Sequence, residues 1–137
     1  MNVGARLEKF LAEDQPVPFD WAQRNCCHAA AAWVACLTGT DPMAGLPATP
    51  DALGARRLLR AWGGNLQAAV SARLQLPSVL PTEAHTGDVA LLYAMRSDGV
   101  GGSLGIVSGR HVWSITDHGH WQAQPLDGAL CAWRVAP

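Results

Sequence analysis

The sequence lacks a surplus of charge of either sign, and it lacks long apolar runs. Its 137 residues include ten basic and eleven acidic side chains, a formal net charge of −1. No basic field is therefore present to hold nucleic acid or an anionic membrane. No run approaches the length of a membrane span, and residues 1–10 lack the apolar stretch of a signal peptide. We expect a protein made in the cytosol, with no nucleic-acid partner and no membrane insertion.

The sequence also lacks the cysteine spacing of a structural metal site. Its four cysteines are Cys26, Cys27, Cys36 and Cys131, with no Cys-x-x-Cys pair and no histidine at zinc-ligand spacing from them. We therefore expect no metal and no cofactor, and free thiols as is usual in the cytosol. Cys27, Cys36 and Cys131 lie in apolar runs, which predicts small core residues.

Aromatic residues other than tryptophan are scarce, with one Tyr and two Phe against six Trp. Tryptophan suits places where a large apolar body also donates one hydrogen bond, in cores and at interfaces alike. Trp33 and Trp133 lie in apolar segments and are predicted core residues. Trp62, Trp113 and Trp121 lie near the ends of predicted elements and are candidate anchors for a partner protein.

The hydrophobic pattern changes character at about residue 86. Hydrophobic residues make up 49% of the chain, which suits one domain with one modest core over residues 1–137. Periodicity and capping residues predict a helical part, 1–80, with helices over 3–12, 26–38, 51–61 and from 65 to 74. Alternating patterns and turns predict a β-meander, 86–136, with strands over 87–94, 103–108, 111–115, 121–124 and 130–135. The fold class is therefore α+β, with N-terminal helices packed on a C-terminal antiparallel meander.

Residues 19–37 form the stretch around which the chain is organised. They run from a polar loop into an Ala-rich helix. Asn25 is a good N-cap, because its side-chain oxygen can accept a free N–H of the first turn. Cys26 then occupies the first helical position, where the positive helix end stabilises a thiolate. Asp88, at the start of the first predicted strand, is expected to hold backbone N–H groups of its turn.

A cysteine that opens a helix, followed by a Gly-Asp-Val strand start and a Leu-Gly-Ile-Val-x-Gly strand, resembles the NlpC-type cell-wall cysteine peptidases. These are small papain-like domains. Nearly the whole chain also resembles a phage and prophage tail-associated family related to them, through the Cys-Cys helix start and the terminal Ala-Trp-Arg-Val strand. The resemblance implies a papain-like fold, synthesis in the bacterial cytoplasm and a place in the virion tail, with other tail tip or baseplate proteins as partners.

On this resemblance Cys26 falls on the nucleophile, and Asn25 replaces the usual Asp. The base position falls on Ser103, and the third position falls near Ser114. Serine cannot take a proton from a thiol near neutral pH, whereas an imidazole can. The resemblance therefore implies a peptidase fold whose catalytic pair has been dismantled.

A relocated base is the remaining way to rebuild a catalytic dyad. His111, His118 and His120 are the candidates, with His118 and His120 in a predicted turn. His28 shares the helix turn with Cys26 but points about 200° away from it, at 100° per residue, so it is a poor base.

Two function classes follow from these residues. The first is a structural or assembly protein of a phage-type tail tip or baseplate that uses an inherited fold to dock on its neighbours. The second is a cysteine peptidase or amidase that cuts peptidoglycan peptides as the genome is delivered, with Cys26 as nucleophile and the helix start as oxyanion hole. An acyl-transfer or immunity-type module of the same fold is a third, weaker alternative. The absent base favours the first class.

Overall fold

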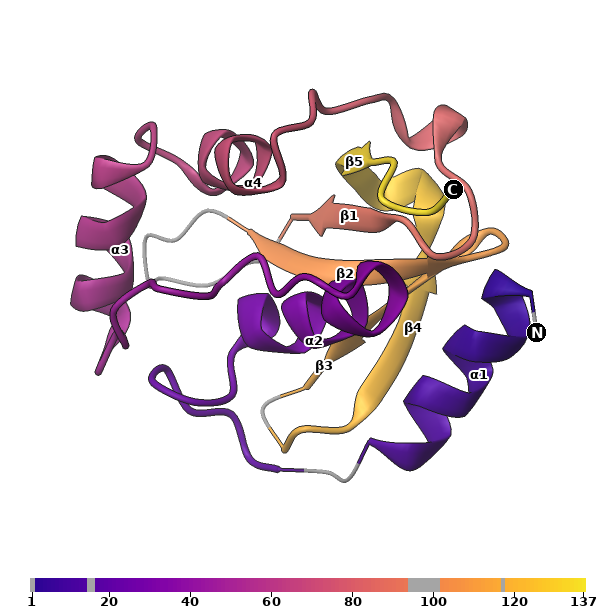
Figure 1. Cartoon of the computed structure of the whole chain (residues 1–137), viewed down its shortest axis with the longest axis horizontal. Coiled ribbons are helices and arrows are strands. Elements are labelled where there is room, and N and C mark those ends of the chain that lie inside the picture. The colour runs from indigo at the N-terminus through magenta and orange to yellow at the C-terminus, as the bar shows by residue number, and fades with distance from the viewer. Residues whose placement is uncertain (1, 15–16, 94–101, 117) are drawn as a thin grey trace.

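The computed structural model describes residues 2–14, 17–93, 102–116 and 118–137. Within them, helices precede an antiparallel sheet, so the fold class is α+β as predicted (Figure 1). The helices are α1 (Val3–Glu13), α2 (Cys26–Thr38), α3 (Ala52–Ala61) and α4 (Leu66–Leu74), with short 3-10 helices η1 (Pro81–Glu83) and η2 (Leu126–Gly128). The strands are β1 (Val89–Leu92), β2 (Ser103–Ser108), β3 (His111–Ile115), β4 (Trp121–Pro125) and β5 (Ala129–Trp133). No helix in these residues is long and apolar enough to cross a bilayer.

The four α-helices begin in the same way. At each start, an Asn or Asp side chain accepts the backbone N–H of the third residue of the helix; these caps are Asn2, Asn25, Asp51 and Asn65. Helix α2 ends at Gly39, whose φ of 82° lies in the left-handed region that favours glycine. The predicted helix starts and the Gly39 stop are confirmed, because they depend on short-range chemistry.

The sheet has the strand order β4-β3-β2-β1-β5, and every pair is antiparallel. Strands β1 to β4 follow one another as a meander, but β5 crosses to pair with β1. The prediction that the meander continues through the last strand is therefore wrong. Strand β1 therefore lies between β2 and β5, and β5 pairs with the edge of β1 that would otherwise be exposed. All four residues of β1 are buried.

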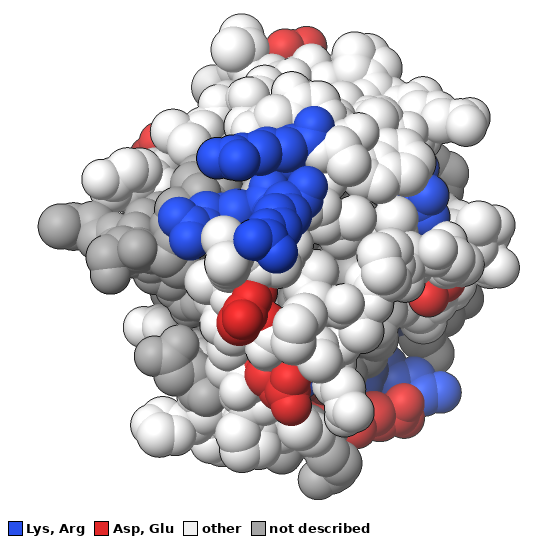
Figure 2. All heavy atoms as spheres, turned by 90° about the vertical axis from the view of Figure 1, so that its left-hand side faces the viewer, with Lys and Arg blue, Asp and Glu red and all other residues white. Residues whose placement is uncertain are grey.

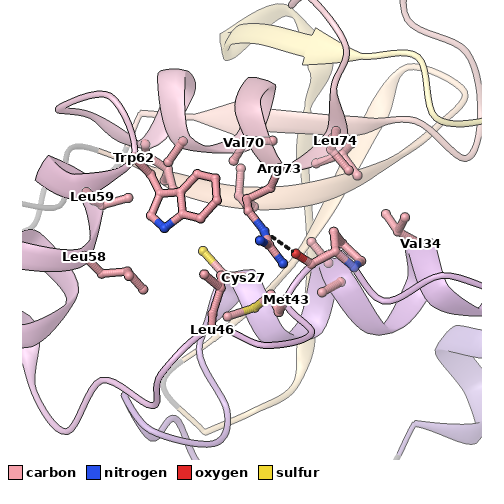
Figure 3. A pocket seen from close by; sticks show the side chains of 17 residues that line it. Cys27, Val34, Met43, Leu46, Leu58, Leu59, Trp62, Val70, Arg73 and Leu74 are labelled. Carbon is pink, nitrogen blue, oxygen red and sulfur yellow. Dashed lines mark hydrogen bonds between the residues drawn. The ribbon is translucent and has the colours of Figure 1, made fainter.

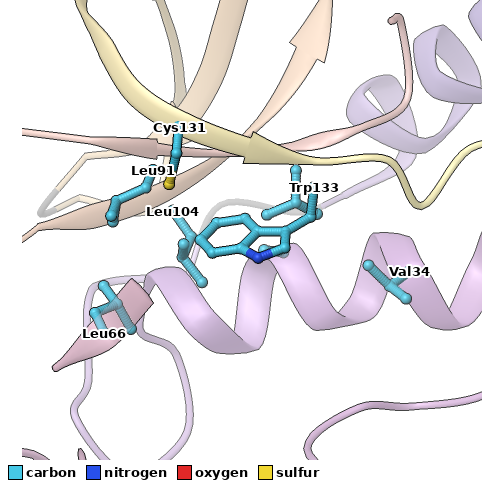
Figure 4. Packing of buried hydrophobic residues seen from close by; sticks show 8 residues of the cluster. Val34, Leu66, Leu91, Leu104, Cys131 and Trp133 are labelled. Atoms are coloured by element: carbon cyan, nitrogen blue, oxygen red, sulfur yellow. The ribbon is translucent and has the colours of Figure 1, made fainter. Parts of the chain in front are cut away.

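One face of the sheet packs against α2. Trp133 is fully buried between β5 and α2, beside Leu104 and Val34 (Figure 4). Trp33 of α2 is also fully buried, and its indole Nε1 donates to the Gly87 carbonyl at 2.8 Å. Both tryptophans are core residues, as predicted. This bond ties the centre of α2 to the turn before β1.

The opposite face of the sheet carries its own apolar cluster. Leu92, Val107 and Val112 belong to it, and Leu126 of η2 is packed with them. Along each strand the side chains alternate between the two faces. This alternation decides which residues of β2 and β3 can approach α2.

Two details differ from the sequence-based expectation. The first strand begins at Val89, so Gly87 and Asp88 lie in the preceding turn. Cys36 is exposed, and its prediction as a core residue is wrong because α2 is buried on one side only. Most of the turn predicted over 97–102 lies outside the described residues.

Candidate functional site

The start of α2 is a closed network of hydrogen bonds around Asn25. Its Oδ1 accepts the His28 backbone N–H at 3.0 Å, which caps the helix. Its Nδ2 donates to the Trp21 carbonyl at 2.9 Å, and that carbonyl also accepts from Thr49 Oγ1 at 3.0 Å. A carboxylate could make the first bond but could not donate the second. The structure thus gives a physical reason for Asn in place of Asp at this position.

His28 is engaged in the same network. Its Nδ1 accepts the Asn25 backbone N–H at 3.2 Å, which completes a capping box. Desolvation lowers the pKa of His28, against smaller raising contributions from Asp41 and Asp20. The imidazole is therefore held neutral by burial, with one ring nitrogen occupied by the backbone. Its role as a cap was not foreseen from the sequence, although a polar residue three positions after an Asn N-cap is the signal for it.

The loop before the helix is tied to distant elements. Asp20 and Arg24 exchange backbone hydrogen bonds of 2.9 and 2.8 Å, and Asp20 Oδ1 accepts the Ala22 N–H. The Arg24 guanidinium forms an ion pair with Asp14, both side chains being largely buried. Trp121 Nε1 donates to the same Asp14 carboxylate at 2.8 Å. The end of α1, the loop and β4 thereby fix the position of the helix start.

Cys26 and Cys27 form an interacting pair at this helix start. The pKa of Cys27 is raised well above its ordinary value, first by its hydrogen bond with Cys26, then by burial, and then by the charge of Cys26. Cys26 occupies the first helical position, where the helix dipole favours a thiolate. Burial and the neighbouring thiol thus disfavour the thiolate of Cys27, whereas Cys26 has the position that the helix dipole favours for a thiolate.

A pocket of about 70 Å³ opens beside this pair. Cys26, Cys27, Asn25 and His28 line one side of it. The other lining residues are Phe19, Trp21, Met43, Pro47, Thr49, Ala55, Leu58, Leu59, Leu66 and Gly102. His28 is thus the imidazole among these described lining residues, and its Nδ1 is already bonded to the helix cap. The pocket is mainly apolar, with its polar atoms at the α2 start.

The structure does not bring Ser103 and Ser114 to the face of the sheet on which Cys26 lies. Ser103 pairs with Leu92, and Ser114 lies two positions from Val112 on β3; Leu92 and Val112 both belong to the cluster on the opposite face. Ser114 is buried there and its Oγ is 3.4 Å from Gln124 Nε2. The residue at the start of β2 that borders the Cys26 pocket is Gly102.

Gly102 has no side chain that could act as a base. A Cβ built on it would lie 2.7 Å from Leu91 Cδ1 and 3.0 Å from the Leu92 carbonyl oxygen, so a larger residue would require Leu91 to move. A single residue of offset between Ser103 and Gly102 moves the side chain to the other face of the sheet. The sequence mapping could not show which of the two faces Cys26.

The candidate relocated bases lie elsewhere. His118 and His120 are exposed, in the turn between β3 and β4. Gly119, between them, packs closely on the Val17 backbone. A Cβ at this position would lie 1.9 Å from the Val17 carbonyl oxygen, so only glycine fits there. His111 is exposed at the start of β3. None of the three is among the described residues that line the Cys26 pocket.

The three candidate anchor tryptophans are half-buried rather than fully exposed. Trp121 packs against Phe10 with 6.0 Å between ring centroids and donates to Asp14, so it serves the internal structure. Trp62 lies under the Arg73 guanidinium, 4.9 Å from the ring centroid. Trp113 lies on β3 opposite Ala123.

Asp88 serves the scaffold, as expected. It is fully buried; its Oδ2 accepts the His85 N–H at 2.7 Å and its Oδ1 accepts the Ala136 N–H at 3.0 Å. The carboxylate joins the turn before β1 to the C-terminal segment. It is therefore not available for chemistry at the Cys26 pocket.

Comparison with known proteins places the chain in a family without assigning an activity. Residues 1–135 match the family described as a domain of unknown function, DUF6950. The chain belongs to the DUF6950 family. No curated protein matches the chain. The site geometry is therefore the main guide to what this member of DUF6950 does.

Proposed function

We propose that this DUF6950 protein is a structural or assembly component of a phage-type tail tip or baseplate, built on a papain-like fold that no longer cleaves peptides. The resemblance to phage tail-associated proteins supplies the setting, a virion tail assembled from parts made in the bacterial cytoplasm. The observation that carries the loss of catalysis is Gly102, which stands at the pocket edge where a base would be needed. Nucleophilic catalysis by a thiol requires such a base within hydrogen-bond reach.

A basic surface on α3 supports a docking role. Arg56, Arg57 and Arg60 are exposed on this helix, and Figure 2 shows arginine side chains gathered on that side of the molecule. Helix α3 has no acidic residue and none of its residues is buried. No described residue forms an ion pair with these three arginines. Such a surface suits an acidic patch on a neighbouring tail protein.

The alternative function, a cysteine peptidase or amidase acting on peptidoglycan peptides, is favoured by one observation. Cys26 opens α2, where the helix dipole favours a thiolate. A cysteine at a helix start has part of the equipment for acyl transfer. Peptidase activity would also require a general base that takes the proton of the Cys26 thiol.

Digestion of purified peptidoglycan by the wild-type protein and by Cys26→Ala separates the two functions. We expect no released peptides from either protein, measured by mass spectrometry of the soluble fraction. Cleavage by the wild type that disappears in Cys26→Ala would show an active peptidase and overturn the proposal.

The assembly role is tested in a lysogen that carries the gene. We expect a null allele to abolish complete tails, Cys26→Ala to leave tails and infectivity intact, and Arg56→Glu combined with Arg60→Glu to reduce tail yield. Arg110→Glu is the matched control, because Arg110 is an exposed arginine outside α3. Complete infectious particles from the null allele, seen by electron microscopy and plaque counts, would contradict the role.

A further inference from the structure

An apolar cavity of about 100 Å³ lies between α2, α3, α4 and the loop over residues 40–50. Leu58, Leu59 and Trp62 enclose it from the α3 side, and Val70 and Leu74 enclose it from α4 (Figure 3). Almost all of its lining surface is apolar. The space is partly open to the surface. A concave apolar pocket of this kind is where a small ligand can bury apolar surface.

Arg73 is the charged side chain in the described wall, and two of its three guanidinium nitrogens donate to backbone carbonyls. Its Nε donates to the Pro42 carbonyl at 2.6 Å and its Nη2 donates to the Ala44 carbonyl at 2.7 Å. Its guanidinium also stacks over Trp62 (Figure 3). Arg73 thus holds the loop over the cavity and takes up one face of the Trp62 ring. A polar group inside the cavity would find few partners, so the occupant is apolar there.

The pocket beside Cys26 adjoins this cavity. Five residues line both spaces, namely Cys27, Met43, Leu58, Leu59 and Leu66. The second space has a volume of about 70 Å³. The combined volume of the two spaces is comparable with that of the ~150 Å³ apolar cavity known to hold a benzene molecule. Polar side chains (Asn25, His28 and Thr49) line only the Cys26 end.

We infer that the two adjoining spaces together bind the alkyl chain of a small amphiphilic molecule, whose polar end lies at the start of α2. An alkyl chain is narrow enough to extend from one space into the other, and the polar residues that line only the second space set its direction. This inference goes beyond the proposed tail function and does not depend on it, because binding requires neither catalysis nor assembly.

Titration calorimetry with 1-hexanol, 1-octanol and 1-decanol tests the inference on the whole chain. We expect binding that strengthens about threefold to fourfold for each methylene buried, from ~0.8 kcal/mol per CH₂. Benzene is the compact comparison ligand. No binding of any alcohol, or benzene binding as tightly as decanol with no dependence on chain length, would overturn the inference.

A pair of matched variants locates the site. Ala69 is buried in the cavity wall, whereas Ala72 is exposed on the same helix. We expect Ala69→Leu to fill the cavity and weaken decanol binding at least tenfold, while Ala72→Leu binds as the wild type does. If a folded Ala69→Leu protein binds decanol with wild-type affinity, decanol does not bind in this cavity.

A measurement on the wild type covers the case in which Ala69→Leu does not fold. Cys27 lines the cavity, and Cys36 is exposed outside it. Saturating decanol should slow alkylation of the peptide that carries Cys26 and Cys27 by N-ethylmaleimide several-fold, and leave the rate at Cys36 unchanged. Equal rates at both sites with and without decanol would contradict the inference.

Discussion

The start of α2 and the turn before β1 are the two halves of the sequence pattern that suggested a peptidase fold, and they have different roles. In the turn, Asp88 is fully buried and each of its oxygens accepts a backbone N–H. At the helix start, Asn25 is similarly enclosed, but the next two residues face a pocket. Trp33 joins the halves by donating to the Gly87 carbonyl. The comparison teaches that one half is closed scaffold, whereas the other combines a closed polar network with an open apolar side.

Asp88→Asn should have the largest effect on this comparison. The substituted amide would place its NH₂ against one of the two buried backbone donors, and it would remove the charge from both hydrogen bonds. Because charge-assisted bonds contribute ~1.5–3 kcal/mol each, we expect a loss of about 3 kcal/mol in the free energy of unfolding, measured by urea denaturation. Asp51→Asn is the control, since Asp51 is an exposed cap with one backbone bond and Asn caps equally well. If the two variants have equal free energies of unfolding, Asp88 does not stabilise the fold through its two buried hydrogen bonds.

Asn25→Asp should have an intermediate effect. The carboxylate keeps the helix cap but loses the donation to the Trp21 carbonyl, and it places a charge in a buried site that lacks a donor for it. We expect a loss of about 1–2 kcal/mol in the free energy of unfolding. Asn65→Asp makes the same change at the exposed cap of α4, where only the cap bond is present, and should be nearly neutral. If Asn25→Asp and Asn65→Asp have the same free energy of unfolding, the hydrogen bond to the Trp21 carbonyl is not the reason for Asn at position 25.

His28→Gln should have the smallest effect, visible as a change in pH dependence. Burial lowers the pKa of His28 in the folded state, so below the usual histidine value of about 6.5 the unfolded chain binds more protons. This contribution to stability is present above that value and is lost as the pH falls toward the lowered pKa. Glutamine can still accept the Asn25 N–H, so the variant should lose less stability than the wild type between pH 7.5 and 5.5 in thermal melts. If the stability of His28→Gln depends on pH as strongly as that of the wild type, the titrating group lies elsewhere than in the helix cap.

Much of the local structure could be predicted from the sequence, because it depends on neighbouring residues. The Asn25 cap, the Gly39 stop and the strands over 103–108 and 111–115 lie where the pattern predicts them. Strand partners depend on distant residues instead. A strand after a meander pairs with its predecessor by default, and nothing in residues 129–133 indicates that β5 crosses to β1.

The candidate site was less predictable, because it depends on which face of an element each side chain occupies. Cys26 lies at the helix start expected from the sequence. Ser103 and Gly102 are adjacent in sequence, yet the strand places them on opposite faces of the sheet, and only Gly102 borders the pocket. A motif alignment cannot resolve that difference, since a shift of one residue exchanges the two faces.

By itself the sequence determined that Cys26 opens a capped helix in an α+β domain, because capping and periodicity act over a few residues. The tertiary structure decided what surrounds that cysteine. It set Gly102 at the pocket edge and engaged His28 in the cap, and it left two adjoining apolar pockets beneath α3. These features arise where segments far apart in sequence meet, and their chemistry depends on how the side chains of those segments pack.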